Sequence, residues 1–181
     1  MTDYTHKMAS MPPNVTPELI IIDLLQARQY IPLLAEWHHN EWAYLNPDSS
    51  LELRIEKMQA YLSVDPIPKT YVCLCHGQPA GSAAVVACDM DTHPELTPWL
   101  ASVYVAPSLR RQGIGSALVK HALYQVGLTG MQCLYLFTPD RAAFYRKLGW
   151  QHMTQEYYRG HTVTLMQFDL RADHAPPANN R

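Results

Sequence analysis

The stretch Trp99–Val126, which reads WLASVYVAPSLRRQGIGSALVKHALYQV, decides the fold. Its pattern predicts a strand over 99–105, then a basic turn that holds Gly113 and Gly115, then an amphipathic helix. The first N–H groups of a helix lack partners within the helix, and the helix dipole makes that end electropositive. A strand, a glycine turn and a helix in this order therefore predict a phosphate-binding site at the turn.

The bulk composition is that of an ordinary globular protein. Of 181 residues, 48% are hydrophobic and 17% are charged, and the formal net charge is −2. We expect a flexible leader over 1–17, a single domain over 18–170 and a flexible tail over 171–181. The near-neutral charge gives no reason to expect nucleic-acid binding, and the basic turn suits the phosphate of a small ligand better.

The cysteines and the N-terminal segment indicate a cytoplasmic location. Cys73 and Cys75 would lie on one face of a strand as core thiols, and no second Cys or His pair stands at metal-ligand spacing, so no metal site is expected. Nothing resembles a disulfide framework, which suits a reducing compartment. The segment 1–16 has no apolar core of a signal peptide, and the apolar run 19–25 is too short to span a membrane.

Apolar periodicity and turn residues predict an α/β domain with the element order β-α-α-β-β-β-α-β-α-β-β. The expected strands are 18–24, 69–75, 79–90, 99–105, 131–137, 151–158 and 161–170. The expected helices are 27–44, 51–64, the helix that ends at 126, and 140–148. The run of small residues at 81–84 predicts that another element packs closely against that strand.

The glycine turn does not match two common phosphate-binding motifs. A dinucleotide fingerprint needs a third glycine where Leu118 stands, and a P-loop needs Gly-Lys-Ser/Thr, which is absent. The remaining pattern is Arg110-x-x-Gly113-x-Gly115 after a strand. This pattern resembles the acyl-CoA signature R/Q-x-x-G-x-G/A of the GNAT acetyltransferases.

A second block, Thr138–Trp150 (TPDRAAFYRKLGW), resembles the family segment N-x-x-A-x-x-F/L-Y-x-K-x-G-F/W. Phe144, Tyr145 and Gly149 are among its matching residues, while Thr138 stands where asparagine is usual. The resemblance implies the GNAT acyl-CoA N-acyltransferase fold, a mixed, mostly antiparallel sheet flanked by helices.

The resemblance further implies acetyl transfer from acetyl-CoA to a primary amine of a small molecule or peptide, by direct attack. Pantetheine would enter between strands 99–105 and 131–137 and pair with the backbone, as an added strand does. The residues expected to contact acetyl-CoA are Val103, Tyr104, Val105, Arg110, Arg111, Gln112, Gly113, Ile114, Gly115, Ser116, Thr138 and Phe144.

For the chemistry, the resemblance implies that the backbone N–H of Val105, or of a neighbour at a strand bulge, stabilises the oxyanion. Tyr145 is the expected general acid for the leaving thiolate. Some members carry glutamate where this chain has Trp99, so Glu95 in the preceding loop is our candidate base. The other candidates in that loop are His93 and Asp91.

Residues of the first predicted helix are candidates for the acceptor pocket. In the family, the first two helices commonly cover the acceptor side, which makes Glu41 a candidate there, with one of the adjacent residues His38 and His39. Trp37, Trp42 and Tyr44 are candidates for an aromatic wall of that pocket.

An alternative function is an acyl-CoA-binding sensor on the same fold, which binds the ligand without turnover. Many relatives form dimers, so a homodimer is an expectation of the resemblance as well. The identity of the amine acceptor stays open at this point.

Overall fold

The computed structural model describes residues 18–171, so the expected leader and nearly all of the expected tail lie outside the described residues. The strands are β1 Leu19–Asp23, β2 Lys69–Cys75, β3 Gln78–Val86, β4 Trp99–Val105, β5 Cys133–Thr138, β6 Gln151–Tyr158 and β7 His161–Asp169. The α-helices are α1 Ile31–Trp42, α2 Leu51–Ala60, α3 Ile114–Gly127 and α4 Ala142–Lys147. The element order is the one that the sequence predicts.

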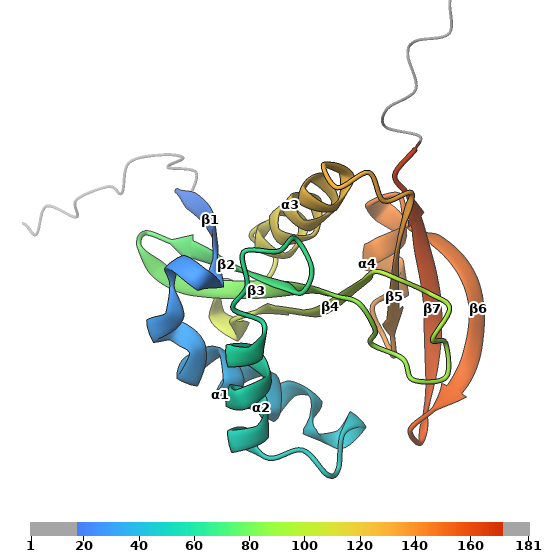
Figure 1. The fold of residues 1–181 in the computed structure, drawn as a ribbon, viewed down its shortest axis with the longest axis horizontal. Helices are drawn as coiled ribbons and strands as arrows, with labels where there is room; N and C mark the ends of the chain where they lie inside the picture. Colours follow the sequence, from blue (N-terminus) through green and yellow to red (C-terminus); the bar gives the residue numbers. More distant parts are fainter. Residues whose placement is uncertain (1–17, 172–181) are drawn as a thin grey trace, which may run out of the picture.

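The strands form one seven-stranded mixed sheet in the order β1-β2-β3-β4-β5-β7-β6 (Figure 1). Every neighbouring pair is antiparallel except β4 and β5, which run parallel. The predicted α/β class with a mostly antiparallel sheet is confirmed.

The two halves of the sheet meet only at one end of β4 and β5. The sole register pair between these strands is Trp99 with Tyr135, and the Tyr135 N–H donates to the Pro98 carbonyl at 3.0 Å. Beyond these residues the strands make no ladder within the described chain. The backbone edges of the rest of β4 and β5 are therefore free to face a ligand.

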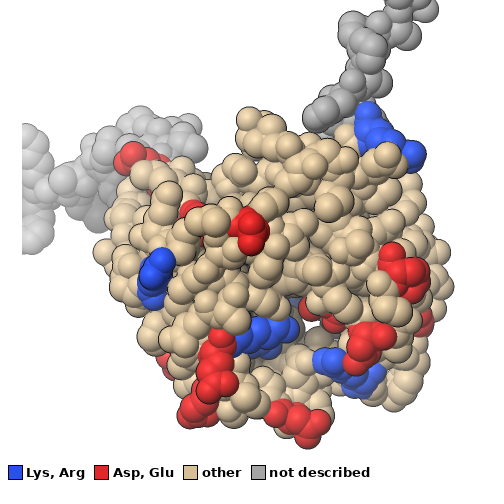
Figure 2. Space-filling view, in the orientation of Figure 1, with Lys and Arg blue, Asp and Glu red and all other residues tan. Residues whose placement is uncertain are grey.

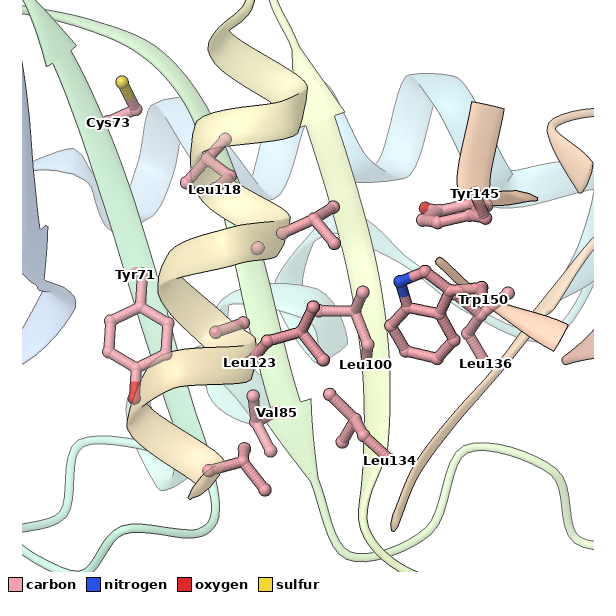
Figure 3. Close-up of a cluster of buried hydrophobic side chains, with 14 of the residues drawn as sticks. Tyr71, Cys73, Val85, Leu100, Leu118, Leu123, Leu134, Leu136, Tyr145 and Trp150 are labelled. Atoms are coloured by element: carbon pink, nitrogen blue, oxygen red, sulfur yellow. The ribbon is translucent and has the colours of Figure 1, made fainter. Parts of the chain in front are cut away.

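Helices cover both faces of the sheet (Figure 1). On one face, Leu118 and Leu123 of α3 pack with Val85, Leu100 and Leu134 of three strands (Figure 3). On the other face, a smaller core joins α1 and α2 to the sheet. The buried residues of that smaller core are Leu24, Ile31, Leu34, Ala35, Met58 and Val72.

Alternate residues of β2 point to opposite faces, as strand geometry requires. Tyr71, Cys73 and Cys75 lie in the core under α3, whereas Val72 lies in the core under α1. The two cysteines are buried free thiols, as expected, and burial raises the pKa of Cys73 to about 11.

The small residues of β3 allow the close packing that the sequence predicts. A Cβ on Gly81 would lie 2.4 Å from the Tyr104 carbonyl oxygen of β4 and 3.2 Å from Leu118 of α3. Glycine at this position therefore allows β3, β4 and α3 to pack closely against one another.

Several elements differ in extent from the predictions, and α2, expected over 51–64, ends at Ala60. The first long helix, expected over 27–44, begins as 3₁₀ turns, and its α-helical part is Ile31–Trp42. The strand expected over 79–90 ends at Val86, and the chain then bends across one end of the sheet. None of the helices described is long and apolar enough to cross a bilayer.

Candidate active site

A β-bulge interrupts β4 beside the point where β5 diverges. The register moves from Ala101 opposite Ala84 to Tyr104 opposite Ser82, so Ser102 and Val103 together face a single residue of β3. Ser102 adopts a φ of 52°, which is uncommon for a residue with a side chain. The bulge turns the backbone of residues 102–103 toward the space between β4 and β5.

The glycine turn presents free backbone donors at the start of α3. Gly113 has a φ of 85° and forms the N-cap, and its carbonyl accepts the first helical hydrogen bond, from Ala117 at 2.9 Å. The N–H groups of Ile114, Gly115 and Ser116 precede that bond and have no partner of their own within the helix. Free donors and the helix dipole make this turn suitable for an anion.

A groove of about 740 Å³ runs from this turn to the bulge of β4. Most of the residues that the sequence predicts as acetyl-CoA contacts line it. They are Val103, Tyr104, Val105, Arg110, Arg111, Gly113, Ile114, Gly115, Ser116 and Phe144. Gln112 does not line the groove, and Thr138 lies in the neighbouring pocket, where its hydroxyl accepts from the Arg141 N–H.

The side chain of Arg110, which lines the groove, contacts both β4 and α1. Its Nε donates to the Val105 carbonyl at 3.0 Å, its Nη2 pairs with Glu41 at 3.1 Å, and its guanidinium lies over the Tyr104 ring at 5.8 Å. Arg110 therefore links the end of β4 to α1. Arg111, the other arginine of the turn, has a φ of 65°. Its side chain makes no ion pair or hydrogen bond within the described chain.

Tyr145 of α4 lies where the groove meets a second pocket. Only 8% of its surface is exposed, and its ring packs edge-on against Phe144 and Trp150. Burial raises the pKa of Tyr145 well above its usual range, with Asp140 adding to the effect and Arg141 opposing it. The phenol therefore stays protonated at neutral pH and can donate a proton.

The second pocket, of about 480 Å³, lies on the side of α1 and α2. It shares Glu41, Val103, Arg141 and Tyr145 with the groove, so the two cavities join at the bulge and the tyrosine. Figure 2 shows the hollow in this face of the molecule, with charged side chains of both signs around it.

Asp89, in the bend after β3, is a carboxylate of this second pocket that the sequence analysis did not identify. It is half-buried and lines the pocket together with Ser102 of the bulge. Burial raises its pKa, and the charges of Lys57, Arg54 and Arg159 oppose the rise. The sequence prediction placed Asp89 inside a strand that continues to residue 90, whereas β3 ends at Val86 and Asp89 lies in the bend that follows.

The loop residues predicted as bases are not gathered at the pocket. Glu95 is mostly exposed and pairs with His93 at 3.0 Å, and His93 also contacts Glu156 at 2.9 Å. Neither Glu95 nor His93 lines the groove or the second pocket, whereas Asp91 lines the pocket and pairs with Arg159 at 3.2 Å. Trp99 is fully buried, and its Nε1 donates to the Leu96 carbonyl.

Of the two histidines on α1, His38 is the one that faces the interior. Its Nε2 lies 2.8 Å from the Ser82 hydroxyl, and Tyr104 packs between it and the stacked ring of Trp37. Trp42 approaches the same Tyr104 ring edge-on. These aromatic rings support β4 from the side opposite α3.

His38 makes stability depend on pH. Burial, together with the charge of Arg54, lowers the pKa of His38 to about 3 from an ordinary value of 6.5. A histidine with a lowered folded-state pKa stabilises the fold fully above its unfolded pKa and loses that contribution as pH falls below it. We expect the free energy of unfolding to fall by about 2 kcal/mol between pH 7 and pH 5 because of this residue.

Urea unfolding of the wild type and of His38→Gln at both pH values measures this effect. Glutamine can still bond Ser82 but does not titrate, so the variant should lose about 2 kcal/mol less than the wild type over this interval. Equal losses in the two proteins would show that His38 does not carry the effect.

Comparisons with known proteins agree with the fold. Residues 66–152 match the model of the acetyltransferase (GNAT) domain. No curated protein matches the sequence. Many solved structures share the fold, among them yncA from Salmonella typhimurium, whose structure holds its cofactor acetyl-CoA. That chain is 18% identical with a TM-score of 0.65, and the match covers 89% of this chain and 99% of that one.

Two further similar structures are named by activity. One is a ribosomal-protein-alanine N-acetyltransferase from Brucella melitensis, 18% identical with a TM-score of 0.66, matching 83% of this chain and 99% of its own. The other is an N-acetyltransferase from Staphylococcus aureus Mu50, 16% identical with a TM-score of 0.65, matching 84% of this chain and 99% of its own. Residues 66–152, slightly less than half of the chain, are thus similar to the acetyltransferase domain of the GNAT family.

Proposed function

We propose that the protein transfers the acetyl group of acetyl-CoA to the amine of an acceptor bound in the second pocket. The observation that carries this proposal is the junction of the two cavities at Val103 and Tyr145. A thioester that lies along β4, with its phosphates at the glycine turn, would bring its acetyl group to this junction. An amine in the second pocket would meet it there.

The residues at the junction supply what the transfer needs. The amine nitrogen attacks the thioester carbon, and the negative charge that develops on the carbonyl oxygen needs preorganised donors. The backbone N–H of Val105 is our candidate donor. The Ala106 N–H bonds to the Ala80 carbonyl of β3 at 2.9 Å, so in the alternating ladder the Val105 N–H points away from β3.

Collapse of the tetrahedral intermediate breaks the carbon–sulfur bond and releases the thiolate of CoA. Tyr145 donates its proton to that sulfur, since its buried phenol is protonated at neutral pH. The amine must lose a proton to attack and to form the amide. We assign that proton to Asp89, because burial raises its pKa and it lines the acceptor pocket. The placement of Glu95 outside both cavities does not support the same role for it.

The enzyme and sensor hypotheses differ in turnover. We expect acetyl-CoA to bind with a 1:1 stoichiometry, and free CoA to be released when amines from a broad panel are added. The presence of Tyr145 at the junction and of Asp89 in the acceptor pocket favours the enzyme. Measurable affinity for acetyl-CoA without release of CoA on any amine would favour the sensor.

Tyr145→Phe should lower kcat by about 10–100-fold, because water must then protonate the leaving thiolate. The dissociation constant for acetyl-CoA should change by less than about 3-fold, since phenylalanine preserves the packing against Phe144 and Trp150. Stopped-flow turnover and calorimetry measure the two quantities separately. An unchanged kcat would remove Tyr145 from the proton path.

A further inference from the structure

Two cations of α2 face the acceptor pocket without an ion-pair partner in residues 18–171. Arg54 and Lys57 stand three residues apart, on one face of the helix, and both line the second pocket. Arg54 is half-buried, and its Nε is buried with no hydrogen-bond partner. A buried guanidinium nitrogen without an acceptor is unfavourable, so this arrangement points to a ligand that supplies one.

The other charges of the pocket are already paired. Glu41 pairs with Arg110 at 3.1 Å, as described above, and Asp91 pairs with Arg159 at 3.2 Å. Asp140 pairs with the adjacent Arg141 at 3.2 Å.

Of the charged lining residues, the described chain leaves three without an ion pair: the two cations Arg54 and Lys57, and the carboxylate Asp89. The charges of the pocket without an ion pair are therefore two positive and one negative.

We propose that the acceptor is a small amino carboxylate, whose carboxylate is bound by Arg54 and Lys57 and whose amine faces Asp89. This inference rests on the proposed function and names the substrate class of the same site. A guanidinium beside an ammonium suits an anion with two oxygens, because both groups donate hydrogen bonds to it. A carboxylate at this position is drawn in by the unpaired cations, while a second ammonium group is repelled.

The shape of the site leaves room for an amino-acid side chain. The pocket of about 480 Å³ adjoins a wider cavity of about 670 Å³, which Arg54 and Lys57 also line. The apolar residues of that wider cavity are Tyr44, Leu45, Pro47 and Leu53. An acceptor bound through its carboxylate at α2 can therefore extend an apolar side chain toward these residues.

The inference is tested with matched pairs of acceptors. Release of CoA is measured for the twenty amino acids and for their carboxamides, which keep the amine and lose the negative charge. We expect kcat/KM to be at least about 30-fold higher for the best acid than for its carboxamide. Equal turnover of the acids and carboxamides, or preference for peptides or polyamines, would overturn the inference while leaving acetyl transfer intact.

A substitution of Arg54 tests where the carboxylate of the acceptor binds. Arg54→Gln should raise KM for the best acid at least about 30-fold, with KM for acetyl-CoA nearly unchanged. Lys120→Gln, an exposed lysine of α3 that lines neither cavity, is the matched control and should leave both KM values as they are. An aminoalkylphosphonate of similar length distinguishes a carboxylate site from a general anion site, since a carboxylate site should turn it over at least about 10-fold less well.

A binding measurement separates failure of this inference from failure of the proposed function. N-acetylated amino acids, which carry the carboxylate but cannot accept an acetyl group, are titrated calorimetrically into the CoA-bound protein. Binding that Arg54→Gln weakens supports the carboxylate site even if no amine is turned over. Absence of binding to the wild type, or equal binding to Arg54→Gln, contradicts it.

Discussion

A Gly115→Asp variant is expected to bind acetyl-CoA at least about 100-fold more weakly than the wild type. The position lies in the first turn of α3 and lines the groove, so a carboxylate there would stand against the anionic diphosphate of the ligand. An added Cβ by itself meets only ordinary contacts, at 3.4 Å from Phe144 and 3.6 Å from Val105. The loss should therefore come from charge rather than from misfolding.

Gly115→Asn is the control for size, because asparagine matches aspartate in shape and carries no charge. We expect it to retain affinity to within about 10-fold, and both variants to unfold at temperatures close to the wild type. Calorimetric titration with acetyl-CoA and thermal unfolding measure the two properties. Unchanged affinity in the aspartate variant would mean that the diphosphate does not bind at this turn.

An Asp89→Asn variant is expected to lower kcat at least about 100-fold, because asparagine cannot take the proton from the attacking amine. Its stability should be equal to or greater than that of the wild type at pH 7. The raised pKa of Asp89 means that its ionised form is disfavoured in the fold, and the substitution removes that unfavourable term. The stability difference should vanish at low pH, where the carboxyl is protonated in both folded and unfolded states.

Comparison of this variant with Glu95→Gln distinguishes between Asp89 and Glu95 as the base. Glu95→Gln should leave kcat nearly unchanged, since Glu95 pairs with His93 outside both cavities. If instead Glu95→Gln lost activity and Asp89→Asn did not, the proton would leave through the loop that the sequence alone suggested.

The fold was predictable because each element carries its own local signal. The apolar strands on either side of His76 and Gly77 predict a hairpin, and β2 and β4 begin and end where the sequence places them. Gly149, expected as the cap of the short helix over 140–148, indeed has a φ of 92°. The glycine turn was predictable because glycine adopts a positive φ without steric cost, as Gly113 does at the start of α3.

The acceptor side was less predictable because it depends on contacts between distant segments. Asp89, Arg54 and Arg159 come from a bend, a helix and a hairpin turn, and only the folded chain brings them to one cavity. Likewise, the motif places Arg110 at the phosphate-binding turn but does not reveal its ion pair with Glu41. The two residues lie 69 positions apart in the sequence. Partner choice among exposed charges is set by tertiary structure, which spacing along the sequence does not encode.

The most direct test of the account follows a labelled acetyl group from acetyl-CoA to an amine. With acetyl-labelled acetyl-CoA and the best amino-acid acceptor, we predict that label appears on the acceptor nitrogen in the same molar amount as the free CoA released. The Tyr145→Phe and Asp89→Asn variants should slow both products equally. Bound acetyl-CoA that yields no labelled amide, or CoA released only with free acetate, would contradict the account.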